Sequence, residues 1–237
     1  MRGWAAVSLL LFSLSHFAVA ADSETLRIAV AEFPPGFVSL PDGKAGGAAV
    51  PIVEAIFREA GYGTDLHIYP IGRVHALIED GSVDVSVATR FFDTDGSMIF
   101  TDTPFGSIQI SLFFREGVPG VASLAELDGK AVIIPIGQST PLAMLQQAAP
   151  NAQILQPRTH ENALHMLRSS RANYLLDWRD PIITLLTERK ERLRHLDLPP
   201  EHSYFVIPRH RKDAEDLVRR LDLAMKKLIG QDGLPAH

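Results

Sequence analysis

The chain has 237 residues, of which 46% are hydrophobic, 22% charged and 8% aromatic, and this excludes a disordered tail protein or a fibrous repeat. It contains no cysteine, which excludes a disulfide framework, a thiolate metal site and a cysteine nucleophile. Its 23 basic and 28 acidic residues give a formal net charge of −5, so we expect no nucleic-acid partner.

The first twenty residues have the pattern of a secretory signal peptide. Arg2 supplies a positive charge, an apolar stretch runs from Trp4 to Leu14, and Ala18 and Ala20 supply the small residues of a cleavage site. The stretch is shorter than the roughly 20 apolar residues that span a bilayer. We therefore expect residues 1–20 to be removed and the mature chain to be periplasmic. An N-terminal anchor that is never cleaved is the alternative.

The next part of the chain alternates strands and helices. Apolar residues recur at every second position in the strands and at helical spacing between them. Pro51 and Gly61 fit the first turn and the end of the first helix. The predicted elements of this first series are strands at 26–30, 66–68 and 83–87 and helices at 52–60 and 74–78.

A second series of strands and helices follows. Ser123 with Glu126 has the pattern of a capping box that starts a short helix. Thr140 before Pro141 opens another helix, and Asp180 before a proline caps a third. The remaining predicted elements are strands at 108–113, 131–136, 154–155, 174–176 and 203–207 and helices at 163–167 and 217–228.

These two series predict an α/β protein with two lobes, each a mostly parallel sheet flanked by helices. We expect residues 21–110 together with 203–237 to form the first lobe and residues 111–202 to form the second. The two crossings, near 111–114 and 199–203, would act as hinges. A ligand would then lie between the lobes, at the carboxyl ends of the strands.

Motifs of hydrolytic and metal chemistry are incomplete. The segment from Gly137 to Pro141 differs from a serine hydrolase elbow by its final proline. His160 and Glu161 are followed by His165, one residue too late for a zinc-binding helix. Neither glycine-rich phosphate motif occurs. We therefore expect no catalytic residue, no metal and no cofactor.

The order of several segments is distinctive, and it resembles the bacterial extracellular solute-binding proteins of family 3, the amino-acid type of the ABC importers. That resemblance implies a type II periplasmic-binding fold, which closes like a Venus flytrap over a small polar solute, an amino acid or a related carboxylate. It also implies a monomer that delivers the solute to the transmembrane subunits of an ABC permease. The segments that carry the resemblance are LRIAVAEFPP from Leu26, LIEDGSVD from Leu77, FTDTPF from Phe100, LDGKAV from Leu127 and LLD from Leu175.

The resemblance also implies positions for ligand contacts. Phe33 would place an aromatic ring against the ligand, and Thr89 would bind it through its hydroxyl and backbone. Ser139 and Thr140 open a helix whose free N–H groups favour a carboxylate, and Asp177 would hold an α-ammonium group. Each residue also has a purely structural alternative: a core-edge Phe, a strand-end Thr, a helix N-cap, and a carboxylate that caps the next helix.

The resemblance fails at one position. Where the family carries an Arg that binds the α-carboxylate, this chain has Thr94. Arg90 and Arg73 are the candidate replacements, and Arg90 as a surface residue is the alternative.

Two further functions remain open. A sensor or orphan protein that signals to a membrane partner would close over its ligand in the same way. A dehydratase-like periplasmic enzyme on the same fold would need a general acid or base, for which Glu32 and Asp177 are candidates.

Overall fold

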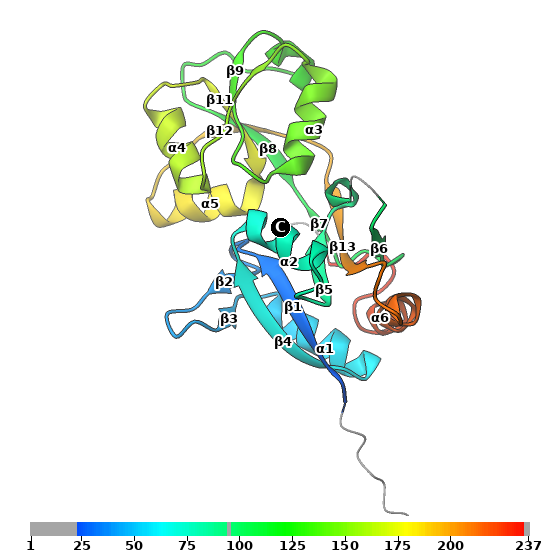
Figure 1. Ribbon diagram of the computed structural model, residues 1–237. Helices are drawn as coiled ribbons and strands as arrows, with labels where there is room; N and C mark the ends of the chain where they lie inside the picture. The colour runs from blue at the N-terminus through cyan, green and yellow to red at the C-terminus, as the bar shows by residue number, and fades with distance from the viewer. Residues whose placement is uncertain (1–22, 94–95, 235–237) are drawn as a thin grey trace, which may run out of the picture.

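The computed structural model describes residues 23–93 and 96–234 (Figure 1). The predicted signal peptide at 1–20 and the position of Thr94 lie outside these residues. The described chain forms two β-sheets, one in each of two lobes, and a small hairpin of β2 (Val38–Ser39) and β3 (Ala45–Gly46). No helix in this part of the chain is both long enough and apolar enough to cross a membrane.

The first lobe is built on a sheet with the strand order β4-β1-β5-β13-β6, and β7 also pairs with β13. Strand β1 runs parallel to its two neighbours, β4 and β5, whereas β13 returns antiparallel from the far end of the chain. The strands are β1 (Thr25–Ala31), β4 (Gly63–Tyr69), β5 (Val85–Ala88), β6 (Met98–Phe100), β7 (Gly106–Ile108) and β13 (Glu201–Pro208).

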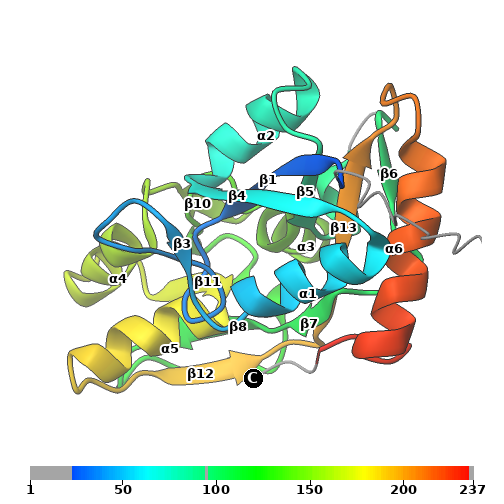
Figure 2. The ribbon, with the colours of Figure 1, turned by 90° about the horizontal axis from the view of Figure 1, so that it is seen from below.

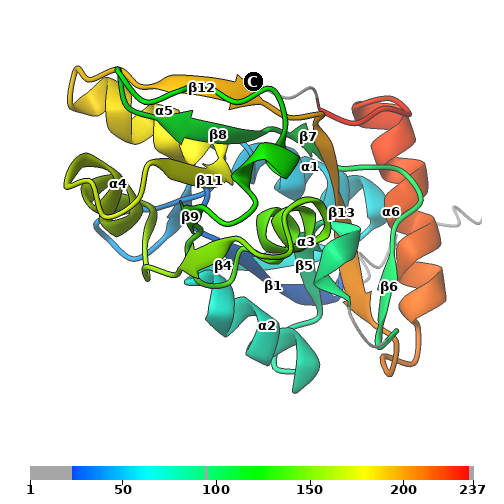
Figure 3. The same ribbon diagram turned by 90° about the horizontal axis from the view of Figure 1, so that it is seen from above.

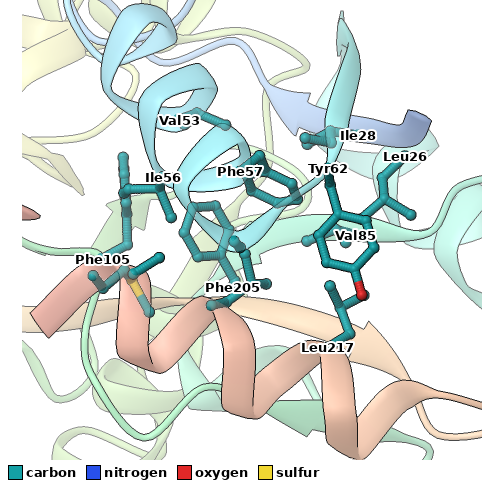
Figure 4. Packing of buried hydrophobic residues seen from close by; sticks show 14 of the residues in the cluster. Leu26, Ile28, Val53, Ile56, Phe57, Tyr62, Val85, Phe105, Phe205 and Leu217 are labelled. Atoms are coloured by element: carbon teal, nitrogen blue, oxygen red, sulfur yellow. The ribbon is translucent and has the colours of Figure 1, made fainter. Parts of the chain in front are cut away.

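Helices cover both faces of this sheet: α1 (Val50–Ala60) and α6 (Ala214–Leu228) on one face, and α2 (Ile71–Glu79) on the other. Figure 2 shows α1 and α2 on opposite sides of β1 and β4. The alternation predicted from the sequence explains this arrangement, because Ile28 packs with α1 while its neighbour Ala29 packs with α2. The ring of Phe205 meets that of Phe57 edge-on, at 5.2 Å between centroids, in the main core (Figure 4).

The second lobe has the strand order β10-β9-β11-β8-β12. Strands β9, β10 and β11 are parallel, and β8 is antiparallel to β11 and β12. Helix α3 packs on one face and helices α4 and α5 on the other, as Figure 3 shows around β9 and β11. The elements are β8 (Ile110–Phe114), β9 (Ala131–Ile133), β10 (Gln153–Leu155), β11 (Tyr174–Trp178), β12 (Arg194–Asp197), α3 (Ser139–Ala148), α4 (His160–Arg168) and α5 (Arg179–Glu188).

At two predicted helix starts, the expected side-chain cap was wrong. Ser123 precedes only a 3₁₀ turn, η2 (Leu124–Leu127), and makes no side-chain cap. The Glu126 carboxylate instead accepts a hydrogen bond from the Ala122 N–H at 2.8 Å, one residue before the expected partner. Asp180 lies inside α5, whose N-cap is Trp178 without a side-chain cap. Helix α4, by contrast, is capped by the Thr159 hydroxyl, which accepts from the Asn162 N–H.

Two short segments carry the chain between the sheets. The strand bounds put 111–114 inside β8, so these segments are Gln109, between β7 and β8, and residues 198–200, between β12 and β13. They are bonded to each other, because the Gln109 side-chain amide donates to the Leu198 carbonyl. The Leu198 N–H in turn donates to the Ile110 carbonyl at 3.0 Å. The two crossings therefore form one connected strip between the lobes.

Candidate ligand-binding cleft

A cavity of about 400 Å³ lies between the two lobes and is lined by residues of both. Parallel strands of the first sheet lead into it: Val30 and Ala31 end β1, and Val87 and Ala88 end β5. Trp178 ends β11 on the opposite side. The cavity therefore lies at the carboxyl ends of strands from both sheets, where open α/β sheets bind their ligands.

Most of the lining is apolar, and its aromatic side chains meet across the cavity. The Phe33 ring, just after β1, contacts the Trp178 ring edge-on with 6.1 Å between centroids. Phe33 also packs against hydrophobic clusters of both lobes. Its backbone is held by reciprocal hydrogen bonds with Phe37 at 2.9 Å. This ring therefore forms a fixed apolar wall shared by the two lobes.

Two threonine hydroxyls join the lobes on the polar side of the cavity. Thr89 follows β5 in the first lobe, and Thr140 lies in the first turn of α3 in the second. Their Oγ1 atoms are 2.7 Å apart, and the residues are 6% and 1% exposed. The cavity is thus bounded by a hydrogen bond that exists only while the lobes are together.

The loop that leads into α3 touches the first lobe directly. Gly137 has a φ of +86°, and a Cβ atom built on it would clash with the side chain of Ile71 at the start of α2. Glycine meets both conditions, since it tolerates positive φ and leaves room for Ile71. Gln138 and Ser139 follow and line the cavity at the N-terminal end of α3.

Asp177 lies next to the cavity, and both oxygens of its carboxylate already have partners within the protein. Its carboxylate is fully buried and is not part of the lining. One oxygen is 2.8 Å from Nδ1 of His160, and the other accepts the Trp178 N–H at 2.8 Å. Burial by itself lowers the pKa of His160. Asp177, its hydrogen bond and the charge of Glu32 outweigh that effect and raise the pKa.

The structure brings four of the sequence-predicted residues to the cavity: Phe33, Thr89, Ser139 and Thr140. Of the other four, Asp177 lies behind the residues that line the cavity.

Glu32 is exposed outside the cavity, and its N–H donates to the Tyr69 carbonyl. The Arg73 guanidinium lies 5.1 Å from the centroid of the Tyr69 ring. That of Arg90 lies 4.4 Å from the Tyr204 ring and 5.4 Å from the Phe100 ring. Both arginines lie outside the lining.

Sequence reasoning missed several lining residues. Trp178 and His75 belong to no motif, although the alternation of β11 would have identified Trp178 as a strand end. Gln138 and Asp180 lie in segments that were considered only as an incomplete hydrolase elbow and a helix cap. Burial lowers the pKa of His75 against the opposing charge of Glu79. Asp180 has the Arg179 guanidinium 4.0 Å from its carboxylate. Within the described ranges no group of acidic or histidine side chains could hold a metal ion.

No known protein-family model matches the chain, and no curated protein matches its sequence. Solved structures match its fold. An ancestral arginine-binding protein bound to arginine is 19% identical, with a TM-score of 0.73 over 90% of this chain and 96% of that one. A histidine kinase sensor domain with similarity to periplasmic binding proteins is 17% identical, with a TM-score of 0.75 over 87% and 91%.

The periplasmic VFT2 domain of Bordetella pertussis BvgS is 18% identical, with a TM-score of 0.71 over 88% of this chain and 89% of that one. At these identities the comparisons establish the fold. The chain has the two-lobed, Venus-flytrap fold of periplasmic binding proteins, and each lobe is an α/β unit built on one sheet.

Proposed function

We propose that this chain is a periplasmic binding protein that captures a small polar solute, an amino acid or a related carboxylate, between its lobes. One observation carries the proposal: the cavity is lined from both lobes, which meet at the Thr89–Thr140 hydroxyl pair. A solute held by both walls favours the closed arrangement by its differential affinity for it. The strip formed by Gln109 and residues 198–200 would be the hinge.

Within the proposed site, Phe33 supplies the apolar wall, and Thr89, Ser139 and Thr140 supply hydrogen bonds. The N-terminal turn of α3 adds backbone N–H groups that have no partner within the helix. Glu32, Arg73, Arg90 and Asp177 remain predicted ligand contacts. Each would have to leave its present place, because none lines the cavity.

We further propose that the captured solute passes to an ABC permease. Signalling is the second candidate, and the likeness to a histidine kinase sensor domain favours it. Measuring uptake of the labelled solute by cells with and without the chain separates the two. Loss of uptake supports delivery, whereas unchanged uptake with an altered response of a membrane kinase supports sensing.

Binding is tested by thermal unfolding of the chain without residues 1–20, after refolding from denaturant to remove co-purified solute. The panel contains amino acids, small carboxylates, amines and sugars. A binding solute raises stability by about 2.7 kcal/mol at a hundredfold excess over its dissociation constant. We expect a shift with a member of the first two classes and recovery of that solute unchanged. Silence across the panel contradicts solute binding, and conversion of the solute supports the enzyme alternative.

A further inference from the structure

The charges around the cavity are arranged unfavourably for a ligand ammonium group. Asp180 is the only acidic side chain among the described lining residues, and it lies in the first turn of α5 with the Arg179 guanidinium 4.0 Å away. Behind the wall, Asp177 is enclosed by His160 and the Trp178 N–H. An ammonium group in an apolar cavity needs a carboxylate partner to offset its desolvation. Each of these two carboxylates already has a cationic neighbour in His160 or Arg179.

The polar part of the lining instead offers hydrogen-bond donors. It lies at the N-terminal turn of α3, a helix of ten residues whose dipole favours an anion. Gln138, the N-cap residue of this helix, is only 8% exposed and lines the cavity. Its side-chain amide has no hydrogen-bond partner among residues 23–93 and 96–234. Its amide atoms are not sealed off by protein, so they are open to a ligand in the cavity.

The lining carries no arginine or lysine in the described ranges, and burial lowers the pKa of His75, which also lines the cavity. Neutral donors would therefore hold an anion. The opposite part of the cavity is apolar, with the Phe33 and Trp178 rings meeting edge-on. A ligand that fits both parts has one anionic end and an aromatic or branched apolar body.

We propose that the cavity binds a monocarboxylate without an ammonium group. Its carboxylate would be received by the first turn of α3, Gln138 and the hydroxyl of Ser139, and its apolar body would lie against Phe33 and Trp178. This inference rests on the proposed function, since it names the class of solute for the same cleft. It makes Gln138 a specificity-determining residue, with His160 acting indirectly by occupying Asp177.

Three matched compounds test the inference by isothermal titration calorimetry: 3-phenylpropionate, L-phenylalanine and 2-phenylethylamine. They share a ring and a two-carbon spacer and differ in their charged groups. A second set, 4-methylpentanoate, L-leucine and 3-methylbutylamine, replaces the ring by a branched chain. We expect at least one acid to bind about tenfold or more tightly than its amino acid, because the ammonium group is desolvated without a partner. Amines should not bind.

Gln138→Glu gives the sharpest variant, with Gln146→Glu, at an exposed position of the same helix, as the matched control. A negative charge at position 138 should weaken acid binding about tenfold or more, and the control should leave it unchanged. If the ligand were an amine, the same substitution would strengthen binding.

Tighter binding of an amino acid or amine than of its matched acid overturns this inference and leaves solute binding standing. Failure of both acids to bind at millimolar concentration overturns it as well. If the wider panel is also silent, the proposed function fails with it. Equal circular dichroism spectra and unfolding midpoints for the two Gln variants exclude misfolding as the cause of a loss.

Discussion

The hydroxyl oxygens of Thr89 and Thr140 lie 2.7 Å apart although the two residues belong to different lobes. Both residues are buried, so either hydroxyl would be left without its partner if the other were removed. This pair, rather than a charged contact, closes the polar side of the cavity.

Removing the pair tests its part in joining the lobes. Thr89→Val or Thr140→Val should each lower the free energy of unfolding by about 1–2 kcal/mol, because each leaves one buried hydroxyl unpaired. The double variant should lose less than the sum, which a double-mutant cycle measures in urea. Thr103→Val is the matched control, since the Thr103 hydroxyl is buried without a hydrogen-bond partner. Strict additivity of Thr89→Val and Thr140→Val would show that the two hydroxyls do not interact.

Gly137→Ala separates contact between the lobes from backbone strain. The new Cβ would meet Ile71 across the cleft, and the φ of +86° disfavours alanine. Gly129→Ala is the matched control, because Gly129 has a φ of +71° and open space around it. We expect both variants to lose about 1 kcal/mol of stability.

Only Gly137→Ala should increase the radius of gyration in small-angle X-ray scattering and weaken solute binding. Equal effects of the two variants on scattering and binding would mean that the approach of Gly137 to Ile71 does not limit closure.

The His160–Asp177 pair should make stability depend on pH. The pKa of His160 is raised above its ordinary value of 6.5 in the folded chain. Its stabilising contribution is therefore fully present below pH 6.5 and is lost as the pH rises through the folded pKa. The difference in unfolding free energy between the wild type and His160→Gln should shrink from pH 6 to pH 9.

Two variants control this measurement, which is made by urea unfolding at each pH. Asp177→Asn should reverse the sign of the pH dependence assigned to His160, because burial lowers the imidazole pKa once the carboxylate is gone. His165→Gln, at an exposed position of the same helix, should leave the dependence unchanged. A wild-type minus His160→Gln difference that is flat across this range would refute the charged pair.

Replacing Arg90 tests whether its guanidinium stabilises the fold or contacts the ligand. Its guanidinium lies over the Tyr204 and Phe100 rings. Arg90→Gln should therefore lower the unfolding free energy by about 0.5–1 kcal/mol. If the guanidinium stays on these rings when solute binds, the substitution leaves solute affinity unchanged. Arg73→Gln, which removes a cation from above the Tyr69 ring, is the comparison. A loss of affinity in Arg90→Gln without a loss of stability would restore Arg90 as a ligand contact.

Local patterns were sufficient for most of the elements. Alternation predicted β1, and helical spacing between Pro51 and Gly61 predicted α1, because both elements place one side chain after another in the same core. Strand β12 was missed. Its residues, Arg194–Asp197, are mostly exposed at a sheet edge and show no apolar alternation.

The site was only partly predictable, for a physical reason. Ser139 and Thr140 were found because a helix start is a local feature. The pairing of Asp177 with His160 and the stacking of Arg90 on Tyr204 depend on elements far apart in the sequence. A motif gives a residue's place along the chain, but these tertiary partners decide whether its charge is available to a ligand.

The distance between the lobes, measured in solution, shows whether the cleft closes over a ligand. Because the native chain has no cysteine, Ser82→Cys beside α2 and Gln147→Cys on α3 would carry the only two spin labels, one in each lobe. In pulsed electron resonance, the refolded chain should give a broad distance distribution that shortens and narrows when 3-phenylpropionate or another bound carboxylate is added. Gln138→Glu should remove that response. A distribution that stays the same with every solute that raises the unfolding midpoint would contradict closure of the cleft over a ligand.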